Sequence, residues 1–264
     1  MKQDYSILKG GIKTPLLTQD GSMTMFSKEF NEPYHSDKDG ALNESILKHI
    51  EPSFNLKKSK KSITILDICF GLGYNTFATL YYHKKLNLKN KLHIISPEFD
   101  KDLIESLSSF QYPKEFDFLK PIIDILSQNY FYEDDNIKIE ILIGDARETL
   151  PKIKSRFDII YQDAFSPTNN PLLWTREYFK EISKLIKDDG VLTTYSTSAS
   201  VRMGLDENGF KLFLHKAEGI RESMLASKEM LEDFKFIDME LKKLRNREAR
   251  SMRDEDYMGD KNKC

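Results

Sequence analysis

From about residue 62 onward, short apolar runs alternate with longer amphipathic segments, and this alternation predicts repeated strand–helix units. The runs are rich in β-branched residues and apolar on both faces, as expected for strands covered by helices on both sides of a sheet. Repeated units of this kind predict a mainly parallel sheet with right-handed crossovers. We expect strands at 62–68, 91–96, 137–143, 157–162 and 190–196, and helices near 75–86, 100–109, 117–129, 174–187 and 199–208.

The segments that flank these units follow other patterns. The first 61 residues contain turn signals, two short strand-like pieces and a helix expected from Ala41 to about Ile50. Alternation at 210–216 and at about 221–227 predicts an antiparallel hairpin at the edge of the sheet. After residue 227 the chain is highly charged, so we expect a helix to about residue 250 and then a frayed tail. We therefore expect an N-terminal extension that packs over the ligand site (1–61), an α/β domain (62–227), and a charged C-terminal helix and tail (228–264).

Composition narrows the class of protein. The chain has 264 residues, of which 39% are hydrophobic and 31% charged, which is enough for a large core. Its net charge of −2 argues against a broadly basic nucleic-acid binder, although local basic patches still act over ~8–10 Å. The two cysteines, Cys69 and Cys264, are far apart and give no disulfide or zinc spacing, so we expect no metal and a reducing, cytoplasmic setting. The N-terminus has no apolar leader and the sequence has no run of about 18 apolar residues, so we expect no signal peptide and no membrane span.

A glycine-rich turn follows the first strand of the α/β region, in DICFGLGYNTF (67–77). A dinucleotide site would need a third glycine where Thr76 stands, and a phosphate-binding loop would need Gly-Lys-Ser/Thr. An acidic residue before a Gly-x-Gly turn is instead typical of Rossmann-like methyltransferases that bind S-adenosylmethionine (SAM), and Asp67, Gly71 and Gly73 match that pattern. Glycines let the backbone approach the aminoacyl part of SAM. Cys69 occupies the usual first glycine position, where we expect it to need a negative φ; an ordinary βα turn without a ligand is the alternative.

Two more acidic residues follow the next two strands. Glu98 ends the second strand in HIISPEFD, where its carboxylate could accept hydrogen bonds from ribose hydroxyls. Asp145 follows the third strand in GDARETL, where it could accept from the adenine amino group while the Ala146 amide serves a ring nitrogen. Each carboxylate alone could instead cap a helix. Acidic residues after three successive strands, at the edge where open α/β sheets bind ligands, favour a SAM site.

The fourth strand ends in QDAFSPTNNPLLWT (162–175) and carries a possible substrate site. Asp163 is expected to point into the same crevice, with Phe165 two residues later. A carboxylate followed by an aromatic ring suits a substrate with an amino group and a planar base, since a ring stacked on a base contributes ~1–3 kcal/mol. The alternative is an ordinary loop that ends the strand.

These motifs resemble the family of methyltransferases that complete 5-methylaminomethyl(-2-thio)uridine at the wobble position of tRNA. The family occurs as the N-terminal half of a two-enzyme fusion, the MnmC type, or as a stand-alone, MnmD-like enzyme. The resemblance covers roughly residues 14–227. General methyltransferases lack its two most specific blocks, TQDGSMTMFSKEFNEPYHSDKDGALNES (18–45) and QDAFSPTNNPLLWT. The others are DICFGLGYNTF, HIISPEFD, GDARETL, YSTSASVRMGLDENGF (195–210) and EGIRESML (218–225).

The resemblance implies a class I, Rossmann-like fold, SAM as cofactor and the tRNA anticodon loop as partner. It implies N-methylation of the 5-aminomethyl group, with Asp163 positioning the amine and receiving its N–H, and with Phe165 flanking the uracil. Tyr34 would close over the cofactor, and Arg202 and Arg221 would lie near the tRNA. Departures from the family pattern are Cys69, Met203 and Ile220, the last two replacing potential phosphate-binding cations. The residues implied to hold SAM are Asp67, Gly71, Gly73, Asn75, Glu98, Asp145 and Ala146.

Two other functions remain open from the sequence. An aminopropyltransferase of the spermidine synthase type shares the fold and the acidic residues, and it would carry more acidic residues in its substrate pocket. An RNA-binding module with a SAM fold would bind cofactor without turnover. The pattern makes no prediction about self-association.

Overall fold

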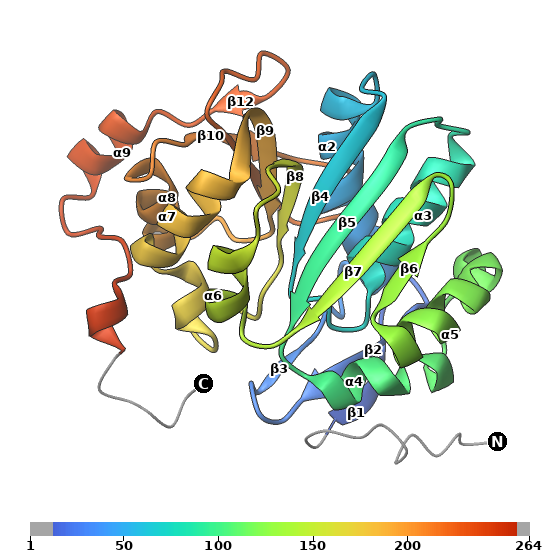
Figure 1. The fold of residues 1–264 in the computed structure, drawn as a ribbon. Helices are drawn as coiled ribbons and strands as arrows, with labels where there is room; N and C mark the ends of the chain where they lie inside the picture. The colour runs from blue at the N-terminus through green and yellow to red at the C-terminus, as the bar shows by residue number, and fades with distance from the viewer. Residues whose placement is uncertain (1–12, 258–264) are drawn as a thin grey trace.

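The computed structural model describes residues 13–257, which form a nine-stranded sheet with helices on both faces (Figure 1). The strand order is β12-β10-β11-β9-β8-β4-β5-β7-β6. The five central strands pair in parallel, as the repeated strand–helix pattern predicts. They are β4 (Ser62–Ile68), β5 (Lys91–Glu98), β7 (Ile137–Ile143), β8 (Phe157–Gln162) and β9 (Ile186–Thr194).

Alternate side chains of these strands enter two hydrophobic cores, one on each side of the sheet. In β8, Ile159 and Tyr161 enter one core and Ile160 enters the other; Phe157 also enters the second core, because the pairing with β9 shifts register between Phe157 and Ile159. The first core is covered by α3 (Tyr74–Lys85), α4 (Lys101–Ser106) and α5 (Lys120–Asn129). The second is covered by α6 (Ala146–Thr149), α7 (Arg176–Leu185) and α8 (Ala199–Asp206). Both faces are therefore buried, which explains why the strands are apolar throughout.

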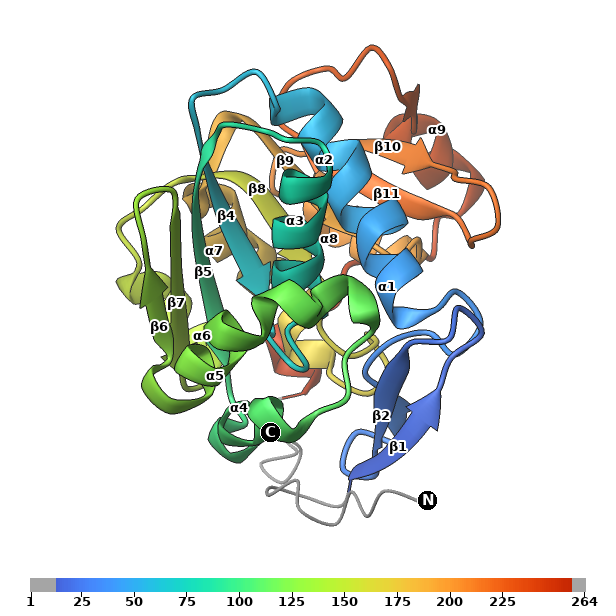
Figure 2. The ribbon, with the colours of Figure 1, turned by 90° about the vertical axis from the view of Figure 1, so that its right-hand side faces the viewer.

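The N-terminal segment forms a second, smaller sheet and a long helical segment (Figure 2). The sheet pairs β1 (Lys13–Leu17), β2 (Met23–Ser27) and β3 (Glu32–Pro33) antiparallel. The helix expected to end near Ile50 continues to Lys57, as α1 (Ala41–Glu44), a π-helical turn (Ser45–Ile50) and α2 (Glu51–Lys57). Pro52 has no N–H to donate to the Lys48 carbonyl, which favours a wider turn at this point.

The C-terminal part differs from the expected helix to residue 250. The predicted hairpin is present as β10 (Lys211–His215) and β11 (Ser223–Ser227), but β12 (Lys235–Phe236) pairs outside it. The following helix, α9, spans only Met239–Arg245. The prediction of one long helix is wrong because buried Leu231 and Ile237 and the pairing of β12 hold this stretch against the sheet instead.

The tail expected to fray after residue 250 is instead packed as far as the structure describes it. Ser251 is buried, and the Met252 carbonyl accepts a hydrogen bond of 2.8 Å from the Arg176 amide at the start of α7. Asp254 forms an ion pair with Arg147 of α6. The charged residues of this segment therefore form ion pairs with distant parts of the chain, which fix the segment against the fold. The rest of the expected tail, 258–264, lies outside the described residues.

Besides β12, the sequence did not predict β6 (Phe131–Glu133) at the far edge of the sheet or the early start of β9 at Ile186. Phe157 of β8 pairs with Ile186, so the chain enters the sheet directly at the end of α7.

Candidate functional site

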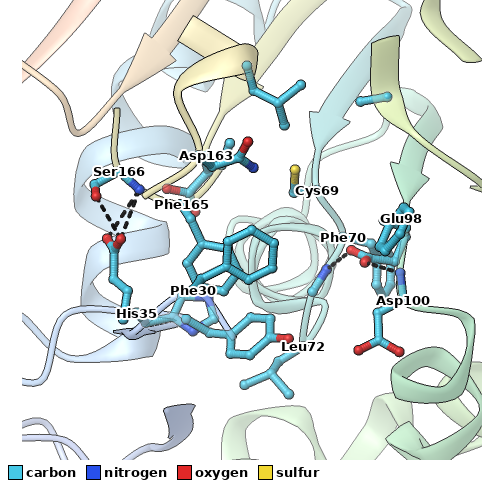
Figure 3. Close-up of a pocket in the computed structure, with 18 of the residues that line it drawn as sticks. Phe30, His35, Cys69, Phe70, Leu72, Glu98, Asp100, Asp163, Phe165 and Ser166 are labelled. Carbon is cyan, nitrogen blue, oxygen red and sulfur yellow. Dashed lines mark hydrogen bonds between the residues drawn. The ribbon is translucent and has the colours of Figure 1, made fainter. Parts of the chain in front are cut away.

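A pocket of about 800 Å³ opens at the carboxyl ends of the parallel strands (Figure 3). The loops after β4, β5, β7, β8 and β9 form one side, and the N-terminal segment from Glu29 to Asp37 forms the other. Its volume lies in the usual range for small-molecule sites, and its position is the usual one in open α/β sheets. Of the predicted site residues it is lined by Tyr34, Gly71, Asn75, Glu98, Asp145, Ala146, Asp163, Phe165 and Arg221, but not by Asp67, Gly73 or Arg202.

The turn after β4 adopts left-handed backbone at three of its residues. Gly71 has φ 53° and Gly73 has φ 75°, conformations that favour glycine. Cys69 has φ 65°, so the expectation of a negative φ at this position is wrong. The turn needs a glycine-like conformation there whichever residue occupies it, and the protein carries that strain. Burial raises the pKa of the Cys69 thiol, which keeps it protonated and weakly nucleophilic at neutral pH.

The two glycines of this turn do different things. A Cβ at Gly71 would lie 3.1 Å from Cδ1 of Tyr34, so the absence of a side chain leaves room between the turn and the Tyr34 ring. A Cβ at Gly73 would lie 2.4 Å from the ring of Phe77, so Gly73 permits close packing where α3 begins. Gly71 belongs to the pocket, whereas Gly73 shapes the turn behind it.

Glu98 fastens the turn to the end of β5. One carboxylate oxygen accepts a hydrogen bond of 2.7 Å from the Gly71 amide, and the other accepts one of 2.7 Å from the Asp100 amide. Burial raises the pKa of Glu98 in spite of these two bonds. Each carboxylate oxygen retains capacity for a further hydrogen bond, so Glu98 can organise the turn and still receive ligand hydroxyls.

Asp67 lies below the pocket rather than in its wall. It is 1% exposed and accepts a hydrogen bond of 2.8 Å from the Thr76 hydroxyl of α3. Burial raises its pKa to about 7. From this position Asp67 can stabilise the turn after β4 through α3, on the side away from the pocket.

Asp145 caps a helix and also lines the pocket. Its side chain caps α6 through a hydrogen bond of 2.8 Å from the Arg147 amide, and it also lines the pocket with Ala146. The neighbouring Arg147 reaches away to Asp254. The C-terminal segment is therefore connected to the edge of the pocket.

Asp163 lies where three parts of the chain meet. Its Oδ2 accepts a hydrogen bond of 2.8 Å from the Asn75 amide of α3, and its Oδ1 lies 3.4 Å from Nε2 of His49 in the π-helical turn. Burial alone would raise the pKa of Asp163, but His49, His35 and Asn75 outweigh it and lower that pKa. The carboxylate is thus ionised and largely shielded from water. In Figure 3 the Cys69 side chain lies between Asp163 on one side and Glu98 on the other.

Aromatic rings form the wall beside Asp163. Phe165 stacks on Phe30 with ring centroids 4.5 Å apart and planes 18° apart, and it meets Tyr34 edge-on at 4.9 Å. Glu32 accepts hydrogen bonds from the Ser166 amide (3.0 Å) and hydroxyl (2.7 Å), which joins the N-terminal segment to the loop after β8. A flat ring could pack against this wall.

The two arginines expected near RNA are not equivalent. Arg221 lines the pocket and donates from Nε to Asp39 at 3.1 Å, while most of its side chain is exposed. Arg202 lies on α8 and does not line the pocket. Arg221 is therefore the one of the two that a ligand leaving the pocket would meet.

Four residues near Asp163 and its aromatic wall were not predicted: Phe30, Glu32, His35 and His49. All four belong to the N-terminal segment, whose role the alternation of strands and helices does not reveal. Their closeness to the Tyr34 motif in the sequence is the signal that could have suggested Phe30, Glu32 and His35. His49 carries no such signal.

Within residues 13–257, no group of three or more His, Cys, Asp or Glu side chains is arranged to hold a metal ion. Over the same range, no helix is both long enough and apolar enough to cross a membrane.

A family comparison and a solved structure both relate this chain to SAM-dependent methyltransferases of the MnmC type. A family described as S-adenosyl-L-methionine-dependent methyltransferase matches residues 116–229. The crystal structure of MnmC2 from Aquifex aeolicus has a TM-score of 0.81 and 32% identity, covering 95% of this chain and 81% of that chain. Spermidine synthase from Thermotoga maritima, at a TM-score of 0.50 and 17% identity, covers 96% of this chain and 92% of that one and shares the fold alone.

Curated relatives match over a similar range. An uncharacterized protein of Methanocaldococcus jannaschii is 32% identical over 201 residues, covering 73% of this chain and 53% of the relative. The tRNA 5-methylaminomethyl-2-thiouridine biosynthesis bifunctional protein MnmC of Leptospira borgpetersenii is 26% identical over 228 residues, covering 81% of this chain and 34% of the relative. The chain thus spans about half of the first relative's length and about a third of the second's.

Proposed function

Because the chain belongs to the family of MnmC-type SAM-dependent methyltransferases, we propose that it methylates the 5-aminomethyl nitrogen of the wobble (2-thio)uridine in tRNA. The product is 5-methylaminomethyl-(2-thio)uridine. The observation that supports this most directly is the shielded, ionised Asp163 beside the aromatic wall of Phe165 and Phe30. With tRNA as the substrate, we propose that the reaction takes place in the cytoplasm.

The residues around the pocket suit SAM. The space above Gly71, the acceptor capacity of Glu98 and the carboxylate of Asp145 correspond to the aminoacyl, ribose and adenine parts of that cofactor. Tyr34 covers the turn from the N-terminal side, and we propose that the extension (1–61) closes over the cofactor bound to the methyltransferase domain (62–227). SAM, when bound, supplies an electrophilic methyl group.

Asp163 prepares the amine. An alkylamine is mostly protonated at neutral pH, so it must lose a proton before its nitrogen has a free lone pair. The Asp163 carboxylate can accept the N–H and orient that lone pair toward the cofactor. Well-oriented reactants gain ~7–11 kcal/mol relative to free encounter. Much of the acceleration of the reaction should therefore come from the alignment of the amine with the cofactor.

The aromatic wall and Arg221 suit a single-stranded RNA loop. Loop bases can be splayed out and stacked on aromatic side chains, and stacking of this kind contributes ~1–3 kcal/mol per base. Arg221 at the rim can meet a phosphate of the strand that enters the pocket. We propose that Phe165 flanks the uracil.

Two carboxylates of the pocket, Glu32 and Glu44, already have partners, which disfavours a polyamine beside Asp163. An aminopropyltransferase needs free carboxylates for its cationic substrate. Of the acidic residues near Asp163, Glu32 is bonded to Ser166, and Glu44 pairs with Lys48 at 2.7 Å. Neither carboxylate is available to a second amine without losing its present partner.

The test incubates the protein with SAM and tRNA that lacks the terminal methyl, followed by mass analysis of the nucleosides. Asp163→Asn should lower turnover by ~10²–10⁴-fold, the usual contribution of a positioned base, with less than a tenfold change in SAM affinity. Asp206→Asn, an acid-to-amide change on α8 outside the pocket, serves as the matched control.

Three results would contradict the proposal in different ways. A variant Asp163→Asn within threefold of wild type removes the role of the carboxylate. SAM binding without modification of any tRNA indicates an RNA-binding module. Transfer of an aminopropyl group from decarboxylated SAM to a polyamine indicates the aminopropyltransferase.

A further inference from the structure

His49 is a buried histidine with one ring nitrogen aimed at the Asp163 carboxylate. It is 0% exposed, and its Nε2 has no hydrogen-bond partner among the described residues. That nitrogen lies 3.4 Å from Oδ1 of Asp163. Nearly all buried polar atoms in proteins are hydrogen-bonded, so a histidine that only filled space here would be expected to have both nitrogens satisfied.

The other ring nitrogen is held in a way that tolerates two protonation states. Nδ1 lies 2.9 Å from the hydroxyl of Thr193 in β9. The Thr193 hydroxyl can accept from an Nδ1–H both in the neutral tautomer, whose Nε2 is free to take a proton, and in the charged imidazole. His49 can therefore gain and lose a proton without leaving Nδ1 unsatisfied.

Asp163 is held so that its other oxygen remains opposite His49. The Asn75 side-chain amide donates to Oδ2, and an amide NH₂ group is a donor only. This bond fixes the rotation of the carboxylate and leaves Oδ1 toward Nε2. The Tyr161 ring meets the His49 ring edge-on, with centroids 5.8 Å apart, which restricts the imidazole in turn.

We propose that His49 is a positioning residue that shares with Asp163 the proton removed from the substrate ammonium. This inference rests on the proposed function. The N–H bond of the ammonium breaks, its electron pair stays on nitrogen, and the proton passes to Asp163 and is shared with His49. The overall reaction releases one proton, which leaves the pair for water after turnover and restores the carboxylate and the neutral imidazole.

The pair avoids a difficulty that a single buried carboxylate would meet. A protonated Asp163 alone would hold its proton beside the newly formed, positively charged methylamine. His49 gives that proton a second position on Nε2, outside the lining of the pocket, while the Nδ1–H stays bonded to Thr193. The titratable groups that face the pair from neighbouring elements are His35, Glu44, Asp67, Cys69, Tyr161 and Tyr195.

Two substitutions separate proton sharing from simple filling of space. His49→Gln can still offer an N–H to Asp163 but cannot be protonated, and His49→Phe keeps a planar ring without nitrogens. His215→Gln is the matched control, because His215 lies on β10 outside the pocket and bonds only to the Leu47 carbonyl among the described residues. SAM affinity within threefold of wild type verifies that each variant is folded; His49→Gln suffices if His49→Phe fails this check.

Single-turnover methylation is measured across the pH range in which histidine titrates. Both His49 variants should be slower by ~10–100-fold at neutral pH, part of the usual contribution of proton transfer, and should lose one ionisation from the wild-type pH profile. His215→Gln should match the wild type. If His49→Gln retains the wild-type rate and the wild-type profile, the imidazole does not hold the proton and the proposal is wrong.

A second measurement needs no tRNA. The ring nitrogens of His49, followed by NMR as the pH changes, should respond differently in Asp163→Asn and in wild type, because the variant removes the charge that faces Nε2. An unchanged titration overturns the pairing. If the wild-type protein leaves tRNA unmodified, the proposed function fails, and this titration alone decides whether His49 and Asp163 share a proton.

Discussion

At position 69, glycine should make the protein more stable than alanine, because the two variants lose the same side-chain contacts and differ in the backbone conformation that they favour. Cys69 has φ 65°, a left-handed conformation that is unfavourable for any residue with a Cβ. The informative comparison is Cys69→Gly against Cys69→Ala. Both variants lose the thiol and its contacts, but only glycine relieves the backbone.

The size of the difference follows from two opposing terms. A left-handed conformation costs a non-glycine residue roughly 1–2 kcal/mol. Glycine loses about 0.5–1 kcal/mol more conformational freedom on folding than alanine. The glycine variant should therefore be about 0.5–1 kcal/mol more stable than the alanine variant. For a chain of this size, that corresponds to a melting temperature about 1–4 °C higher.

Thermal unfolding of the two variants side by side, monitored by circular dichroism, measures the difference. SAM affinity should agree between them within a few-fold, since neither carries the thiol. An alanine variant as stable as the glycine variant would refute the reasoning, because it would mean that position 69 is not left-handed. A glycine variant that is more stable but binds SAM less well would instead show that the strained turn is held in shape by its Cβ.

Three further predictions concern the rest of the site. Glu98→Gln places an NH₂ group opposite a backbone N–H and loses a charged hydrogen bond, which should weaken SAM by ~1.5–3 kcal/mol in calorimetry; wild-type affinity would separate Glu98 from cofactor binding. Asp67 has a folded pKa of about 7 against an ordinary 3.8, so between these values the folded protein keeps a proton that the unfolded chain has lost. The contribution of Asp67 to the free energy of unfolding therefore falls as the pH rises through that window and is level above it. Asp67→Asn should flatten this fall, measured by urea unfolding at several pH values; parallel stability curves for the variant and the wild type would contradict the reasoning. Truncation after Arg250, which the charge pattern alone predicts to be harmless, should lower the melting temperature because it removes buried Ser251 and the Asp254 ion pair; an unchanged melting temperature would show that this segment is dispensable.

Most of the fold could be predicted from the sequence because its strands are short β-branched runs with clear ends. The sequence also predicted that the loops after those strands gather at one site, since the carboxyl ends of parallel strands share one edge of a sheet. Glu98, Asp145 and Asp163 line one pocket for that reason. Asp67 was expected to share that wall, but a carboxylate one residue before the strand ends can bond to the following helix instead, as it does with Thr76.

The remaining features depend on contacts between distant parts of the chain. His49 and Thr193 are 144 positions apart, and a π-helical turn, which helical periodicity does not predict, carries the histidine to Asp163. The C-terminal segment is charged in the manner of a solvated tail, yet Asp254 reaches Arg147 across 107 positions. Charge density alone does not distinguish a solvated residue from one with a partner in the fold.

The edges of the large sheet bear on how the molecule meets other copies of itself. The strands at its two ends, β12 and β6, have two and three residues. An exposed sheet edge can recruit strands from other chains through its unpaired backbone groups, and short edge strands with charged residues limit this. Lys235 in β12 and Glu133 in β6 place one charge at each edge. Neither edge therefore offers enough regular backbone to extend the large sheet into a neighbouring molecule.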